Sequence, residues 1–250
     1  DAATIIPWQH YMAYGDKSIL EQQWDSMKAW VDYVISQSPG YLWNTGWHYG
    51  DWLFYSVNND NAGNSAVTYT PLVQQCFFAN SATIMSKAAE VLGKGEDATY
   101  YADVARKAKE AFCENYLTPA GMLVSSTQTA YVLALNFDML PENMRAKAAA
   151  HLAANVEKYG HITTGFLGTP YICHVLTKFG YNDLAYKLLL REQYPGWLYP
   201  VTMGATTIWE RWNSMMPDRT IPDNGMNSFN HYSYGAIGDW LYRDAVGLHE

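Results

Sequence analysis

Cysteine and basic residues are scarce in this chain of 250 residues. Its three cysteines, Cys76, Cys113 and Cys173, lie far apart and form no CxxC pair. An odd number of cysteines argues against a disulfide framework, and no spacing typical of metal ligands is present. We therefore expect buried thiols and no metal site. This pattern is compatible with a cytoplasmic protein and equally with a periplasmic or secreted one.

Acidic residues outnumber basic ones by 24 to 16, which gives a net charge of -8. Nucleic acids and anionic membranes bind clusters of Lys and Arg, so this balance disfavours both as partners. No apolar run approaches the roughly 18 residues of a membrane-spanning helix. With 49% hydrophobic residues, the chain is long enough for one sizeable core or at most two small domains. We expect a single domain over residues 1–250, and the composition leaves the oligomeric state open.

Aromatic residues are abundant, with 10 Trp and 20 Tyr. Flat aromatic rings stack on the apolar faces of sugars, and indole or phenol groups add hydrogen bonds at the rim. The alternative is a large protein with an aromatic-rich core. Several of these residues lie in loops beside Gly and Asn. That placement favours a binding site for at least some of them.

Helical periodicity predicts an all-α fold. The clearest apolar stripe runs from Leu20 to Ile35 at spacings of four and three, which is one face of a helix. No convincing stretch alternates with period two, so strands should be few. Residues 1–15 are expected to be irregular. Further helices are expected over residues 71–93, 97–112, 127–139, 141–156, 171–179, 183–191 and 233–246.

Long loops rich in aromatic residues separate several of these helices. The first covers residues 41–70, the second 159–170 and the third 193–227. Residues 58–65 are nearly all Asn, Asp, Gly and Ser, which predicts an exposed turn. A long loop in a compact domain usually has a functional reason. We therefore expect the loops to carry the site.

The third loop contains an unusual arrangement of charge and aromatic rings. Trp209 and Trp212 bracket Glu210 and Arg211. Buried aromatic walls raise the pKa of a carboxylate, whereas an adjacent guanidinium lowers it. A carboxylate between these two influences is a candidate general acid or base. The segment by itself is also compatible with a surface Glu–Arg pair beside two core tryptophans.

The segment from Gly204 to Ser214 resembles the signature of bacterial α-L-rhamnosidases, the inverting glycoside hydrolases of family 78. Similar blocks follow one another in the family's order over nearly the whole chain. They are Asp1-Ala2 with Pro7-Trp8, Gly50-Asp51-Trp52-Leu53, Thr164 to Pro170, Tyr194 to Tyr199, and Asn227 to Tyr232.

This resemblance implies an (α/α)6 toroid, the six-hairpin glycosidase fold, with the active site on the face that bears the long loops. The helices expected here are too few to close such a ring. The toroid should therefore be incomplete in this chain, which is similar to the later two-thirds of the family's catalytic domain. The family's general acid lies in an acidic motif without a counterpart in residues 1–250. We expect a sequence trimmed from a longer polypeptide, and a fragment that is inactive alone.

The resemblance also implies the roles of individual residues. Glu210 matches the catalytic base, and His231 matches a histidine that hydrogen-bonds a sugar hydroxyl. For His231 the competing role is a structural histidine at a helix start. Trp52 would form one wall of the sugar pocket. Asp51 would accept a hydrogen bond from a hydroxyl or cap a helix, and both roles are compatible.

Three further residues are weaker candidates for contact with the sugar. Asp1 matches an acidic position of the family near the sugar, although a terminal residue is often disordered. Trp8 and Trp47 would contribute aromatic surface, but tryptophans in such numbers are often part of the core. Arg211 is expected to orient Glu210 or a neighbouring loop. The mechanism implies no metal and no organic cofactor.

Three functions follow, of which hydrolysis of terminal α-L-rhamnose is the first. The second is another α/α-toroid enzyme, a polysaccharide lyase or an unsaturated uronyl hydrolase. Such enzymes bind uronate carboxylates and need Lys or Arg near the site, whereas the loops here offer chiefly Arg211 and Arg219. The third is a non-catalytic sugar-binding domain. It is kept because the general acid is missing from the sequence.

Overall fold

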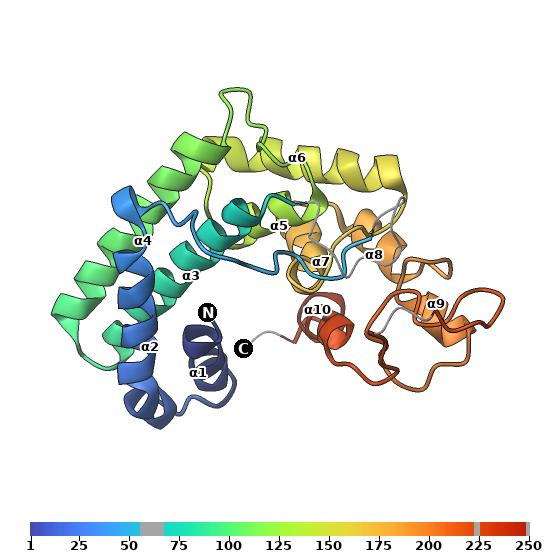
Figure 1. Ribbon diagram of the computed structural model, residues 1–250, viewed down its shortest axis with the longest axis horizontal. Helices are drawn as coiled ribbons and strands as arrows, with labels where there is room; N and C mark the ends of the chain where they lie inside the picture. Colours follow the sequence, from blue (N-terminus) through green and yellow to red (C-terminus); the bar gives the residue numbers. More distant parts are fainter. Residues whose placement is uncertain (56–67, 223–225, 249–250) are drawn as a thin grey trace. The chain divides into compact units, whose positions relative to one another are not determined.

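The computed structural model describes residues 1–55, 68–222 and 226–248 (Figure 1). Helices dominate and no β-strand occurs in these three ranges, which confirms the all-α prediction. The chain forms two compact units. The first comprises residues 1–48 and 71–118, and the second comprises residues 49–70 and 119–250. The single domain over residues 1–250 stays a prediction, and the turn expected at residues 58–65 lies outside the described residues.

The first unit is built from four helices and one 3-10 turn. The residues of the stripe predicted from Leu20 are buried on helix α2, except that Val34 replaces Ile35 at its end. Helix α1 packs against this helix. The elements are α1 (Ala2–Tyr14), α2 (Ser18–Ser36), η1 (Pro39–Tyr41), α3 (Thr70–Val91) and α4 (Gly95–Tyr116).

Helix α1 corrects the expectation that residues 1–15 are irregular. Pro7 lies inside this helix, where it removes one backbone donor and normally interrupts helical structure. Here tertiary packing outweighs that local preference. Pro7 and Thr4 are buried, and the Thr4 hydroxyl donates to Ser81 Oγ on α3 at 3.0 Å. The helix ends at Gly15, whose φ of 68° lies in the left-handed region that glycine favours.

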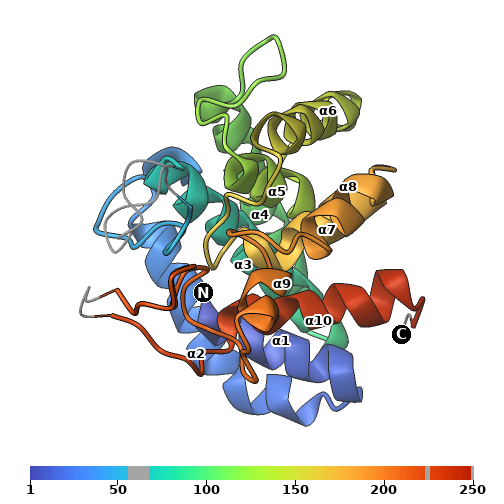
Figure 2. The same ribbon diagram turned by 90° about the vertical axis from the view of Figure 1, so that its right-hand side faces the viewer.

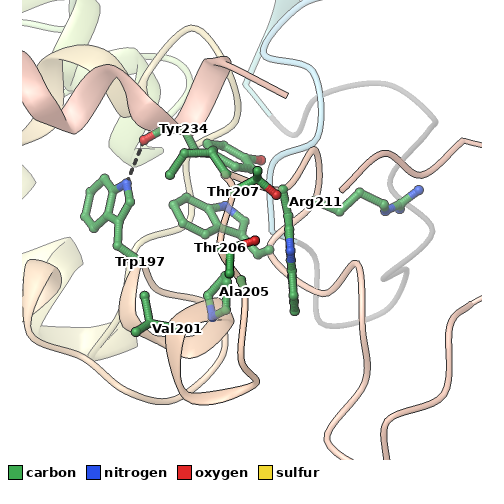
Figure 3. A pocket seen from close by; sticks show the side chains of 11 residues that line it. Trp197, Val201, Ala205, Thr206, Thr207, Arg211 and Tyr234 are labelled. Atoms are coloured by element: carbon green, nitrogen blue, oxygen red, sulfur yellow. Dashed lines mark hydrogen bonds between the residues drawn. The ribbon is translucent and has the colours of Figure 1, made fainter. Parts of the chain in front are cut away.

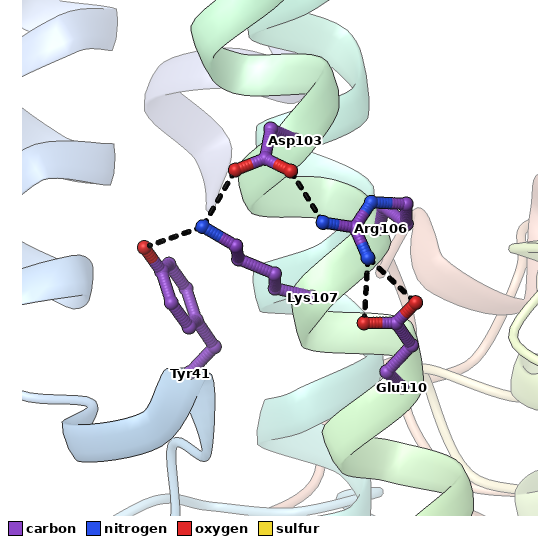
Figure 4. A network of polar contacts seen from close by, with 5 residues as sticks. All are labelled: Tyr41, Asp103, Arg106, Lys107 and Glu110. Atoms are coloured by element: carbon purple, nitrogen blue, oxygen red, sulfur yellow. Dashed lines mark hydrogen bonds and ion pairs between the residues drawn. The ribbon is translucent and has the colours of Figure 1, made fainter.

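The exposed side of α4 carries a small network of charges (Figure 4). Asp103 pairs with Lys107 at 2.6 Å, and Arg106 pairs with Glu110 at 2.6 Å. Hydrogen bonds from Lys107 and Arg106 hold the pKa of Asp103 below its ordinary value. Lys107 also lies 4.9 Å from the centre of the Tyr41 ring, so the network links η1 to α4. Because the charges face solvent, we assign this network little stability and no chemistry.

The second unit is a set of helices around α5 and α7 (Figures 1 and 2). Helix α7 packs against α5, α8 and α10, and α5 is buried from Gln128 to Leu135. No helix in the described ranges is long and apolar enough to cross a bilayer. The α-helices are α5 (Gln128–Asn136), α6 (Glu142–Tyr159), α7 (Thr169–Lys178), α8 (Asn182–Leu189), α9 (Leu198–Thr202) and α10 (Ile237–Trp240).

The last helix, expected as one element over residues 233–246, consists of three consecutive segments. A 3-10 turn, η2 (Ser233–Ala236), leads into α10, and a π-helical turn, η3 (Leu241–Ala245), follows it. The indole of Trp240 is buried, and its Nε1 donates to the Thr177 hydroxyl on α7 at 2.9 Å. This contact ties the segment to the helices that position the loops. The long loops over residues 42–55, 160–168, 203–222 and 226–232 contain five of the residues expected to form the site, whereas Asp1 and Trp8 lie at the start of α1 and on it.

Candidate functional site

Two loop segments of the second unit run side by side and bring Glu210 close to His231. The backbone N–H of Glu210 donates to the Ser228 carbonyl at 2.9 Å. The backbone N–H of His231 donates to the Ile208 carbonyl at 2.8 Å. Each bond crosses between the same two stretches of chain. The residues expected to act as base and as sugar ligand therefore belong to one local structure.

Glu210 is half-buried between two side chains that are almost closed off from solvent. Trp209 is 4% exposed and Arg211 is 3% exposed. The Arg211 guanidinium donates to the Met226 carbonyl at 3.3 Å, so it supports the neighbouring loop, one of the two roles expected for it. Tyr234 stacks on Trp212 of the same segment. Burial, followed by the negative charge of Asp51, raises the pKa of Tyr234 well above its ordinary value, and the charge of Glu210 acts in the same direction.

Asp51 is fully buried and uses both carboxylate oxygens on protein donors. Oδ2 accepts from the Thr129 hydroxyl and from the Gly165 N–H at 2.7 Å, and Oδ1 accepts from the N–H groups of Leu167 at 2.7 Å and Gly168 at 3.2 Å. Burial raises the pKa of Asp51, and these hydrogen bonds oppose the rise. The carboxylate thus supports the loop ahead of α7. It is a structural anchor at this position, close to the capping role considered from the sequence.

The anchored loop touches the segment that carries Trp52. A Cβ atom on Gly165 would collide with the carbonyl oxygens of Asp51 and Trp52, so only glycine allows this approach. The Phe166 N–H donates to the Trp52 carbonyl at 2.9 Å. The Phe166 ring in turn lies 5.0 Å from the imidazole of His231, nearly parallel to it at 19°. Trp52, Phe166, His231 and Glu210 are therefore linked through a short series of contacts.

A pocket of about 280 Å³ adjoins the Glu210 segment (Figure 3). Its aromatic wall is well ordered by hydrogen bonds, because Trp197 Nε1 donates to the Tyr234 carbonyl at 2.9 Å and the Tyr234 hydroxyl donates to the Leu53 carbonyl at 2.7 Å. Glu210 itself is not part of the lining. The lining residues are Trp197, Pro200, Val201, Ala205, Thr206, Thr207, Ile208, Trp209, Arg211, Trp212 and Tyr234.

The first unit contains a second pocket, of about 610 Å³, which includes Asp1 and Trp47. Asp1 Oδ1 accepts from the Ser81 hydroxyl at 2.8 Å and from Trp30 Nε1 at 3.3 Å, so the carboxylate has a defined orientation. Trp47 is 76% exposed at the rim. The remaining lining residues are Trp30, Tyr33, Gln37, Trp43, Thr45, Gly46, His48 and Gln74.

Comparison with known proteins identifies the family. Residues 1–245 match the family described as bacterial alpha-L-rhamnosidase 6 hairpin glycosidase domain. The chain belongs to this family. An alpha-L-rhamnosidase of Formosa agariphila is 43% identical over 254 residues, which cover 99% of this chain and 27% of that protein. An alpha-L-rhamnosidase of Streptomyces avermitilis is 40% identical over 249 residues, which cover 99% of this chain and 23% of that protein.

Solved structures of rhamnosidases have the same fold. The crystal structure of the Streptomyces avermitilis alpha-L-rhamnosidase complexed with L-rhamnose superposes with a TM-score of 0.91 at 40% identity, over 99% of this chain and 23% of that one. The native enzyme from Aspergillus terreus gives a TM-score of 0.92 at 35% identity, and the match covers 97% of this chain and 28% of that one. This rhamnosidase-family chain thus spans about a quarter of the length of its relatives. Membership confirms the six-hairpin glycosidase class expected from the sequence.

The seven residues expected in the rhamnosidase site divide between the two units. Glu210, His231, Trp52 and Asp51 lie in the second unit, and Asp1, Trp47 and Trp8 lie in the first. Trp8 lies on α1 with its ring 5.4 Å from that of Tyr11, and it is not among the residues that line the pocket of the first unit. In the described ranges, no group of three or more His, Cys, Asp and Glu side chains is arranged to hold a metal ion.

Sequence reasoning missed three residues that contact an expected site residue or a neighbour of one within the same unit. Phe166 is inside one of the blocks that resemble the rhamnosidases, but its ring contact with His231 arises from the fold alone. Tyr234 follows His231 closely and stacks on Trp212 with ring centres 3.9 Å apart. Trp30 falls outside the apolar stripe of α2, which marks it as a residue with a different partner. That partner is the Asp1 carboxylate.

Proposed function

We propose that this chain forms part of the catalytic domain of an enzyme that removes terminal α-L-rhamnose from glycosides or polysaccharides with inversion. The observation that supports this proposal most directly is the local structure around Glu210. Its half-buried carboxylate lies between Trp209 and Arg211 in the sequence, and His231 lies on the segment paired with it by backbone hydrogen bonds. Family membership supports the proposal, because the named relatives are alpha-L-rhamnosidases. Those relatives are about four times longer, so the activity is assigned to the complete protein.

Inversion needs two carboxyl groups about 6.5–9.5 Å apart. One protonates the oxygen of the leaving group, while the other removes a proton from the water that attacks the opposite face of the sugar. We assign the removal of the proton from water to Glu210. The general acid is assigned to the complete protein outside residues 1–250, because this chain covers only part of its relatives. The mechanism uses neither a metal nor an organic cofactor.

Each unit by itself offers side chains that we propose as contacts for rhamnose. In the second unit, Trp52 offers a ring face and His231 offers an imidazole N–H to a sugar hydroxyl. In the first unit, Asp1 and Trp47 line a pocket with the mixed aromatic and polar character that suits a sugar. Trp8 remains a weaker candidate on α1. Asp51 acts on the sugar indirectly, since its oxygens already bind the loop before α7.

The test is product analysis with the complete protein and an aryl α-L-rhamnoside, followed by proton NMR from the first seconds. An inverting hydrolase releases β-L-rhamnose first, and the α-anomer appears later by mutarotation. A polysaccharide lyase would instead give a product with ultraviolet absorbance, on a uronate-containing polymer. A sugar-binding domain would bind rhamnose in a calorimeter without releasing it from the glycoside. Either of these two outcomes, or first release of the α-anomer, contradicts the proposal.

A further inference from the structure

The orientation of the His231 imidazole is determined by two neighbouring rings and one backbone donor. The Phe166 ring stacks on the imidazole with 5.0 Å between ring centres and 19° between the planes. The Tyr232 ring stacks on it with 5.4 Å between ring centres and 9° between the planes. These values are typical of offset stacking. The Ser233 N–H donates to His231 Nδ1 at 3.4 Å. A neutral imidazole whose Nδ1 accepts a hydrogen bond carries its proton on Nε2, so Nε2 is the donor.

Phe166 has fixed contacts of its own, whereas Tyr232 is 86% exposed. The Phe166 backbone bonds to the Trp52 carbonyl, and its ring meets the ring of Tyr234 edge-on at 5.2 Å and 67°. The backbone N–H groups of Gly165 and Leu167, on either side of Phe166, donate hydrogen bonds to the buried Asp51 carboxylate. Of the two rings beside His231, the Phe166 ring is therefore the one with a rigid support.

We propose that Phe166 is a positioning residue that sets the plane of the His231 imidazole, so that its Nε2–H is presented to a sugar hydroxyl. The proposal rests on the proposed function, because it takes the sugar as the partner of His231. Phe166 touches no substrate in this scheme and acts through His231. The hydrogen bond from its backbone N–H to the Trp52 carbonyl also joins Phe166 to the residue proposed as a wall of the sugar site.

The experiment is a double-mutant cycle in the complete protein with Phe166→Leu, His231→Ala and the two combined. Each single change is expected to raise KM for an aryl rhamnoside roughly tenfold, the effect of about one lost hydrogen bond. The combined variant is expected to be no worse than His231→Ala, because a side chain that acts only through His231 loses its effect when His231 is absent. Additive effects of Phe166→Leu and His231→Ala would overturn the proposal.

Two further variants separate positioning from loss of folding. Phe166→Tyr keeps the ring and is expected to stay within about twofold of the wild-type KM. Phe179→Leu, at the C-terminal end of α7, is the matched control and should leave KM unchanged while it lowers Tm to a similar degree. A KM for Phe179→Leu as high as that of Phe166→Leu would show that KM reports general destabilisation, and would contradict the proposal.

A crystal structure of Phe166→Leu gives a result that does not depend on activity. The imidazole of His231 is expected to take a different rotamer or two conformers, while the backbone of residues 208–210 and 228–231 stays paired. An imidazole in its present plane would overturn the positioning role. Should the wild-type protein release no rhamnose at all, the proposed function fails, and this structure still decides whether Phe166 orients His231.

Discussion

Asp51 shows how the role of a residue depends on partners that are distant in the sequence. Its position after Gly50 in an aromatic loop predicts a ligand for the sugar or a helix cap. The fold surrounds it with donors that lie 114 to 117 positions later, at Gly165 and Gly168, and with the Thr129 hydroxyl. The sequence around Asp51 contains no pattern that predicts such contacts. Glu210, in contrast, is marked by its own neighbours, because Trp209 and Arg211 are adjacent to it.

Replacing Asp51 with Asn therefore tests an anchor against a sugar ligand. The amide would turn a donor toward backbone N–H groups that now bind a carboxylate oxygen. We expect a loss of roughly 2–3 kcal/mol in the free energy of unfolding, measured by urea denaturation. Asp103→Asn, in the exposed network of α4, is the control and should change stability little. Unchanged stability of Asp51→Asn together with a selective loss of rhamnose affinity would identify Asp51 as a direct ligand.

The half-buried histidines His48 and His161 make stability depend on pH. Burial lowers the pKa of His48 and, as the main cause, that of His161. The folded protein therefore binds fewer protons than the unfolded chain below the ordinary value of about 6.5. This contribution to stability is present above that pH and is lost as the pH falls through it.

Melting temperatures at pH 8, 6.5 and 5 measure this effect. We expect Tm to fall toward pH 5, and we expect a smaller fall in a variant with both His48→Gln and His161→Gln. Carboxylates contribute to both proteins alike at lower pH, so the difference between the two profiles isolates the histidines. A difference that vanishes or changes sign would contradict the assignment.

At the scale of elements, apolar periodicity predicts most helices and misses the ones that depend on tertiary packing. The stripe from Leu20 predicts α2. The helix expected from residue 127 is α5, and the structure shows that the Thr127 side chain caps it. Helix α1 is not predicted from the sequence because Pro7 usually interrupts a helix. Packing against α2 and the hydrogen bond from Thr4 to Ser81 stabilise it nevertheless. The final helix was expected as one element, but it changes from 3-10 to α to π geometry. Periodicity does not distinguish these helix types.

The loops could be located from the sequence, but their pairing could not. Gly, Asn and aromatic residues predict irregular structure over residues 193–227. The hydrogen bonds that join Glu210 to Ser228 and His231 to Ile208 depend on the whole fold. The resemblance to rhamnosidases supplied the candidates at both positions. The structure supplies their proximity and the contact of Phe166 with His231.

The cysteines test how tightly each unit is packed in its own interior, because Cys76 and Cys113 lie in the first unit and Cys173 lies in the second. Burial raises the pKa of Cys76, and burial followed by the charge of Asp244 raises the pKa of Cys173 to about 12. Cys113 is half-buried, and burial and the charges of Glu110 and Glu114 raise its pKa as well. Because the thiolate is the reactive form, none of these thiols should react at the rate of a free thiol at pH 8.

Labelling with a disulfide reagent and peptide mapping measures this reactivity. In the native protein we expect slow labelling, with Cys113 labelled before the other two. In concentrated urea all three should react rapidly. Fast labelling of Cys76 or Cys173 in the native protein would show that the packing described for these residues is wrong.

For the whole molecule, the central claim is that Glu210 is the general base of an inverting rhamnosidase. Its most direct test is Glu210→Gln in the complete protein, with rate, Tm and rhamnose affinity measured on one preparation. Glutamine keeps the size and hydrogen bonding of the side chain but cannot accept the proton. We predict that turnover falls by roughly 10²–10⁴, the usual contribution of general acid–base catalysis, with Tm and affinity little changed.

Glu192→Gln is the matched control, because Glu192 is an exposed residue in the loop between α8 and α9. This variant should retain wild-type turnover. A structural Glu210 predicts the opposite pattern, a lower Tm with preserved turnover per folded molecule. Near-wild-type turnover of rhamnoside by a well-folded Glu210→Gln protein would contradict the account.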